Sequence, residues 1–222
     1  MKPTPLMIAA IVAVVVTYIR AMFFTPLEAV QGAAQKILYV HAPAAWVAFM
    51  AFFLVALASA LYLWLREDRL DRIAEASAEV GVVFTTVVLT TGPIWAKPIW
   101  GAYWTWDARL TLTLFLWFIY LAYMVLRGAV EDRDVRARYS AVVGILGALL
   151  IPFIHLSVYL FRTLHPLPVL LKPSAPSMPG EMLTTLLLAF GSFTLLYVAM
   201  LRARYRYAVA RDDAHPPEAF DA

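Results

Sequence analysis

Six long apolar segments dominate this chain of 222 residues. A bilayer core about 30 Å thick needs roughly 20 helical residues to cross it. The segments are continuous rather than alternating, which favours helices over the strands of a membrane barrel. Only 15% of the residues are charged, whereas a soluble domain has about a quarter. The sequence therefore predicts an all-α integral membrane protein, a single domain over 1–222 built as a six-helix transmembrane bundle with spans at 6–24, 42–65, 76–94, 110–126, 141–161 and 182–201.

The distribution of Lys and Arg predicts the orientation, because cytoplasmic loops carry the excess. With the N-terminus inside, the inner segments hold about twice as many of these residues as the outer ones. Both termini are therefore predicted to be cytoplasmic. Arg20 interrupts the first apolar segment and no small-residue cleavage site follows, so we expect a retained helix rather than a signal peptide.

The net charge of +3 does not require a nucleic-acid partner. The basic residues are spread over the predicted inner ends of the helices, where anionic lipid headgroups lie, so the bilayer is the expected partner. The mixed-charge runs 66–72 and 127–138 are predicted to be solvated inner loops.

Four of the seven tryptophans lie within twelve residues, between the third and fourth apolar segments. The run reads Trp95-Ala-Lys-Pro-Ile-Trp100-Gly-Ala-Tyr-Trp104-Thr-Trp106-Asp107-Ala-Arg109. The predicted topology places it on the outer side. Interfacial anchoring explains single tryptophans, but this density favours a flat aromatic ligand, and Gly101 permits close backbone approach.

Several classes of chemistry are excluded by composition. The chain has no cysteine and therefore no disulfide, thiolate nucleophile or thioether link to a haem. It has no P-loop motif, so it is not by itself a P-loop ATPase. Acidic residues cluster on the predicted inner side, away from the histidines, which argues against a hydrolase. We therefore expect a binding protein rather than an enzyme.

The four histidines differ in predicted location. His41 begins the second helix and His165 follows the fifth, so both share the outer side with the tryptophan run. His155 lies inside the fifth helix, as a buried hydrogen-bonding residue or a partner of a ligand, and His215 lies in the cytoplasmic tail. Two imidazoles on opposite faces make a six-coordinate haem site. A single histidine at a membrane interface is more often a structural, hydrogen-bonded residue than a ligand. The pair of His41 and His165 fits a structural role and a ligand role equally.

Charged residues beside the tryptophans suit the carboxylates of a haem. Lys97 and Arg109 flank the run, and the guanidinium of an arginine binds a carboxylate through two parallel hydrogen bonds. Indole rings would supply the apolar walls. The outer end of the predicted bundle thus holds all the residue types that a haem site requires.

The segment from Trp100 to Arg109 resembles the WGxxWxWD signature of haem-handling membrane proteins. Further matches make the resemblance to the CcmC family of cytochrome c maturation specific, and they extend over nearly the whole chain. They are Tyr39-Val-His41-Ala-Pro43, Trp95-Ala-Lys97-Pro98, Pro152-Phe-Ile-His155 and Thr163-Leu-His165.

The resemblance implies a site and a role. It makes His41 and His165 the axial ligands of the haem iron, with haem b as the expected group. It implies that the protein, in the bacterial inner membrane, presents haem on the periplasmic side to the haem chaperone CcmE. The implied complex contains the ATPase CcmA, the membrane subunit CcmB and the small subunit CcmD, so that ATP hydrolysis belongs to a partner. The implied haem platform consists of Trp95, Trp100, Gly101, Trp104, Trp106, Asp107 and Arg109.

Two other functions are considered. A haem lyase of the larger related families would need more helices and more histidines than this chain has. A b-type electron carrier would pair histidines at mid-membrane, whereas His41 and His165 are predicted at helix ends.

Overall fold

The computed structural model describes residues 3–168, 170, 174–175 and 177–214. Within them the chain is helical, without a β-strand; one isolated bridge joins Glu28 to Gly32. The helices are α1 (Pro5–Ile19) with a π-helical end η1 (Arg20–Phe24), the 3₁₀ turn η2 (Ala33–Ile37), α2 (Leu38–Leu65), α3 (Asp68–Trp100), α4 (Ala108–Ala129), α5 (Arg133–Ala148), α6 (Leu150–Leu160) and α7 (Gly180–Ala214).

Six helical stretches of the described chain are long and apolar enough to cross a membrane, as predicted. Most extend beyond the predicted bounds, because hydropathy marks only the part that suits hydrocarbon, whereas a helix continues into polar surroundings. The largest extension is in α7, which runs to Ala214 rather than to residue 201. Its 35 residues span about 50 Å, well over the thickness of a bilayer core.

The fifth span is divided into α5 and α6 at Leu149. Pro152 lies in the first turn of α6 and has no N–H to donate to the carbonyl of Ala148, four residues earlier. The α-helix is therefore interrupted where that hydrogen bond would have formed. α6 therefore begins as a separate helix, and the segment that carries His165 follows it.

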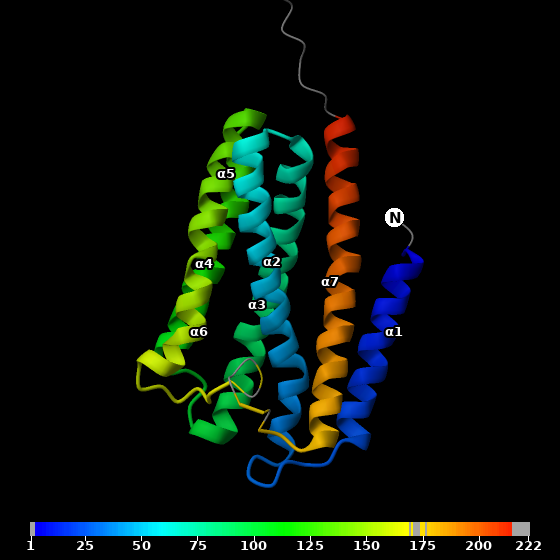
Figure 1. Cartoon of the computed structure of the whole chain (residues 1–222), viewed down its shortest axis with the longest axis vertical. Helices are drawn as coiled ribbons and strands as arrows, with labels where there is room; N and C mark the ends of the chain where they lie inside the picture. Colours follow the sequence, from blue (N-terminus) through cyan, green and yellow to red (C-terminus); the bar gives the residue numbers. More distant parts are fainter. Residues whose placement is uncertain (1–2, 169, 171–173, 176, 215–222) are drawn as a thin grey trace, which may run out of the picture.

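α2 and α3 form the central antiparallel pair of the bundle (Figure 1). α1 and α7 pack together on one side of this pair, and α4, α5 and α6 lie on the other. The start of α1 and the end of α7 lie at the same end of the molecule, which we call the terminal end. The segments 25–37, 101–107 and 161–168 gather at the opposite end, which we call the loop end (Figure 1).

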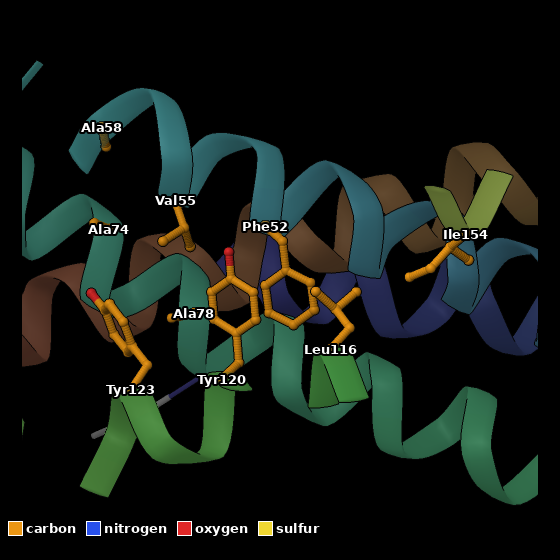
Figure 2. Packing of buried hydrophobic residues seen from close by; sticks show 9 residues of the cluster. All are labelled: Phe52, Val55, Ala58, Ala74, Ala78, Leu116, Tyr120, Tyr123 and Ile154. Carbon is orange, nitrogen blue, oxygen red and sulfur yellow. The ribbon is translucent and has the colours of Figure 1, made fainter. Parts of the chain in front are cut away.

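Aromatic side chains of α2 and α4 pack together in the core (Figure 2), and α5 packs against both helices. The ring of Phe52 stacks on that of Tyr120, with centroids 3.7 Å apart. The Tyr120 hydroxyl donates to the carbonyl oxygen of Gly144 at 2.8 Å. A Cβ at Gly144 would lie 2.8 Å from Val55 Cγ1, so the absence of a side chain allows this close approach. This packing holds α2, which carries His41, against α4, which carries Arg109.

The prediction that the mixed-charge runs are solvated loops is wrong for Asp71 and Arg127, which are buried at the terminal end. Arg127 donates to both carboxylate oxygens of Asp71, at 2.6 and 2.9 Å, and to Glu75 at 3.1 Å. Arg211 of α7 also binds Glu75, at 2.6 and 2.9 Å. Charge pairing between helices permits this burial, and a linear charge pattern does not reveal it.

Candidate functional site

His41 lies in the first turn of α2, at the loop end, and is half-buried against α3. Its Nδ1 is 3.0 Å from Oγ1 of Thr91. The indole of Trp95, one turn further along α3, meets the imidazole edge-on at a centroid distance of 5.8 Å. Trp95 is itself held by a hydrogen bond from its Nε1 to Oε1 of Gln31, at 2.9 Å. Three segments of the chain thus fix the position of His41.

His165 lies in the segment that follows α6. Its backbone N–H donates to Oγ1 of Thr163, and its Nδ1 is 3.0 Å from the carbonyl oxygen of Pro166. The pKa of His165 is lowered to about 4, first because burial disfavours the charged imidazolium and second because Arg109 carries a positive charge nearby. The imidazole is therefore neutral near pH 7 and able to bind a metal ion.

Arg109 lies near both histidines. Its guanidinium lies within electrostatic range of both His41 and His165, and the two imidazoles lie within range of each other. The structure thus brings together two residues that are far apart in the sequence. Their role as axial ligands of a haem iron stays a prediction.

Asp107 joins α4 to the segment that carries His165. As the N-cap of α4, it accepts a hydrogen bond from the backbone N–H of Arg109 at 2.9 Å. Its second carboxylate oxygen accepts from the backbone N–H of Leu164 at 3.1 Å. An open pocket of about 350 Å³ lies here, lined by Thr105, Trp106, Asp107, Arg162, Thr163 and Leu164.

The tryptophan run is only partly a loop. α3 continues through Trp100, beyond its predicted end at residue 94, and Gly101 ends it with a φ of 76°. This left-handed conformation favours glycine. Trp95 and Trp100 therefore lie on the last turns of α3, whereas Trp104 and Trp106 lie in the connection to α4.

The two loop tryptophans differ in exposure. Their rings meet edge-on at 5.9 Å, but Trp104 is half-buried and Trp106 is 78% exposed. Lys97 donates to the carbonyl oxygen of Gly101 at 2.9 Å and lies over the ring of Tyr103. These contacts order the connection while leaving one large aromatic ring accessible from outside.

Four buried polar atoms near the start of α4 have no hydrogen-bond partner in the described chain. An unsatisfied buried polar group costs about 1–3 kcal/mol, so each of these atoms is available to a partner such as water or a bound ligand. Indole and guanidinium N–H groups are donors, and they suit the carboxylates of a haem. The atoms are Trp104 Nε1, Thr105 Oγ1, Arg109 Nη1 and Thr111 Oγ1.

His155 takes no part in the hydrogen bonds and ring contacts described above for His41 and His165. His155 lies in α6 with its ring 6.3 Å from that of Tyr159. His215 lies outside the described residues. The described part of the chain contains no group of three or more His, Asp or Glu residues placed to hold a bare metal ion. The residues at the loop end fit a flat group that brings its own equatorial ligands.

Some residues at the site were not predicted. Thr91 and Gln31 contact His41 and Trp95, and Thr105 and Thr111 hold two of the unpartnered atoms. Gln31, Thr91 and Thr111 lie outside the segment Trp100 to Arg109, and Thr105 occupies a variable position within it, so the linear sequence singles out none of the four. Only their contacts across helices indicate a role.

These features define a polytopic membrane protein that carries an aromatic, cationic and partly open site at one end of its bundle. A family model described as Heme exporter protein C matches residues 2–219. The chain belongs to this family, CcmC, as its motifs predicted.

Individual relatives agree with the family model. Heme exporter protein C of Haemophilus influenzae is 36% identical over 194 residues, which are 87% of this chain and 79% of the relative. Heme exporter protein C of Bradyrhizobium diazoefficiens is 38% identical over 181 residues, which are 82% of this chain and 69% of the relative. Family membership supports a role in haem handling for cytochrome c maturation.

Proposed function

We propose that this protein binds haem as its cargo at the loop end and presents it to a second protein. The observation that carries the proposal is that His41, His165 and Arg109 lie within electrostatic range of one another, at one end of a bundle whose family handles haem. The cargo is haem b. The protein itself catalyses no reaction in this proposal.

The two imidazoles serve as axial ligands of the haem iron. Each has its Nδ1 beside an oxygen, Thr91 Oγ1 for His41 and the Pro166 carbonyl for His165. Histidines that bind metals commonly use the second ring nitrogen in this way. Low proton affinity at His165 favours coordination, because a ligating imidazole must be neutral.

The aromatic segment forms the platform for the porphyrin. Trp95 lies against His41, and Gly101 and Asp107 set the ends of the two helices between which the loop tryptophans lie. The unpartnered donors Trp104 Nε1 and Arg109 Nη1 bind the propionates. The haem platform therefore comprises Trp95, Trp100, Gly101, Trp104, Trp106, Asp107 and Arg109.

Partial exposure suits transfer. Trp106 is largely exposed, and the neighbouring pocket is open to the outside of the bundle. A second protein can reach a haem edge here without separation of the helices. We propose that the recipient is the haem chaperone CcmE, and that CcmA, CcmB and CcmD form the complex with this subunit.

The excess of Lys and Arg at the terminal end supports the orientation in the proposal. The terminal end faces the cytoplasm and the loop end faces the periplasm, with the protein in a bacterial inner membrane. The haem site is then on the side where c-type cytochromes are assembled.

The test is the absorption spectrum of the protein purified in detergent with haem. The double variant His41→Ala, His165→Ala should lose the bis-imidazole Soret spectrum and remain folded. The matched control is His155→Ala, which removes an imidazole whose ring contact is with Tyr159 of its own helix α6 and should leave the spectrum unchanged. Loss of the spectrum in the control, with retention in the double variant, would instead support a b-type carrier with a mid-membrane haem.

A further inference from the structure

The contacts of Thr91 determine which nitrogen of His41 carries a proton. Oγ1 of Thr91 lies 2.7 Å from the carbonyl oxygen of Val87 and 3.0 Å from Nδ1 of His41. A carbonyl oxygen only accepts, so the single hydroxyl proton of Thr91 must be donated to Val87. The hydroxyl oxygen is then left to accept from Nδ1–H of His41.

The opposite assignment is unfavourable. If Thr91 donated to Nδ1 of His41, the hydroxyl and the Val87 carbonyl would face each other at 2.7 Å with lone pairs only. The first arrangement satisfies both contacts, and it leaves Nε2 of His41 without a proton. Nε2 is therefore the nitrogen whose lone pair is available to a metal ion.

The surroundings of His41 keep the imidazole in this arrangement. A Cβ at Gly92 would lie 3.2 Å from Cε1 of His41, so a larger residue there would press on the ring. Trp95 contacts the ring from the same helix, and Gln31 holds Trp95 by its Nε1. The imidazole is thus seated on Thr91, Gly92 and Trp95 of α3.

The geometry points to Thr91 as a positioning residue: it holds His41 in the Nδ1–H tautomer with Nε2 free for the haem iron. The link to haem rests on the proposed function, whereas the tautomer is a property of the protein without cargo. When the ring nitrogen of a histidine that does not bind the metal donates a hydrogen bond, the bond fixes the orientation of the ring. It also makes the other nitrogen a stronger ligand for the metal. Thr91 therefore acts on the cargo through His41 without touching it.

The first experiment measures the tautomer of His41 in the haem-free protein by nitrogen-15 NMR with labelled histidine, and a His41→Gln variant assigns the signal. The wild type should show the Nδ1–H form. Thr91→Val should show a mixture of the two tautomers, and Thr91→Ser, which keeps the hydroxyl, should restore the wild-type signal. The matched control is Thr90→Val, because the hydroxyl of this exposed neighbour donates only to its own helix, at Thr86.

The second experiment measures haem affinity and the midpoint potential of the bound haem. Thr91→Val should weaken haem binding by about tenfold, as expected for loss of such a partner. It should also raise the midpoint potential, since a weaker donor stabilises the ferric state less. Thr91→Ser and Thr90→Val should match the wild type in both measurements.

The outcomes separate this inference from the proposed function. A wild-type His41 protonated at Nε2, or a Thr91→Val variant with the wild-type tautomer, overturns the inference. Unchanged haem affinity and potential in Thr91→Val, with the wild type binding haem, also overturn it. A tautomer that depends on Thr91 as expected, in a protein that binds no haem, supports the positioning of His41 and refutes the proposed function alone.

Discussion

The carboxylate of Asp107 and the backbone N–H of Leu164 are joined by a hydrogen bond of 3.1 Å across 57 residues of sequence. The same carboxylate caps α4, two residues before Arg109. A single side chain therefore holds the start of a helix and the segment next to His165 in a fixed relation.

Asp107→Ala should affect the site more than the fold. Loss of an N-cap costs about 0.5–2 kcal/mol, and the segment carrying His165 also loses its connection to α4. We expect weaker haem binding with a modest fall in thermal stability in detergent. The matched control is Asp132→Ala, which removes the N-cap of α5 at the terminal end. The Oδ1 of Asp132 accepts a hydrogen bond from the backbone N–H of Val135 at 2.7 Å. Equal haem affinities in the two variants would contradict the expectation.

Arg127→Ala should destabilise the bundle strongly. It leaves Asp71 and Glu75 buried without the guanidinium that binds both, and breaking a buried pair costs about 3–5 kcal/mol. Thermal unfolding of the detergent-solubilised protein measures the effect. Arg138→Ala is the control: its partner Asp134 is 3.8 Å away and both side chains are exposed, so a change within about 0.5 kcal/mol is expected. The predicted role of the network is wrong if both variants unfold alike.

Gly144→Ala should loosen the contact between α2 and α5. The added Cβ would lie 2.8 Å from Val55 Cγ1, and overpacking of this kind costs about 1–3 kcal/mol. Gly191→Ala in α7 is the matched control, because a Cβ there has no neighbour within 4 Å. Thermal unfolding should show a loss for Gly144→Ala and none for Gly191→Ala. A loss in both variants would point to an effect of alanine in the helix rather than of packing.

The six spans could be predicted because a helix that crosses hydrocarbon must be long and apolar. Such stretches can be recognised directly in the sequence. Helix ends could not be predicted from that requirement. Trp100 is helical because Gly101 ends α3 there, and α7 reaches Ala214 because its polar end packs through ion pairs such as Arg211 with Glu75. Both depend on partners outside the apolar segments.

The residue types of the candidate site could be recognised from the sequence, but their contacts could not. Lys36 illustrates the difference: although charged, it is buried, with its ammonium donating to the carbonyl oxygens of Ala21 and Thr25. Thr91 illustrates it again, since Thr90 and Thr91 both donate to a carbonyl four residues back and only Thr91 also meets a histidine. Tertiary structure alone separates the two threonines.

The last prediction concerns the exposed tryptophan at the loop end. If Trp106 belongs to the surface that meets the recipient, Trp106→Ala should slow haem transfer to a purified haem chaperone domain, and Trp104→Ala, Trp106→Ala together should slow it further. The control is Trp64→Ala. Trp64 is 80% exposed but lies in the last turn of α2, near the terminal end of the molecule. Stopped-flow absorption of haem-loaded protein mixed with the chaperone domain measures the rate. Trp64 and Trp106 are equally apolar and nearly equally exposed, so a general loss of membrane anchoring would lower the rate in both variants. A selective effect of Trp106 requires a role tied to the site, and equal rates for Trp64→Ala and Trp106→Ala would remove Trp106 from the transfer surface.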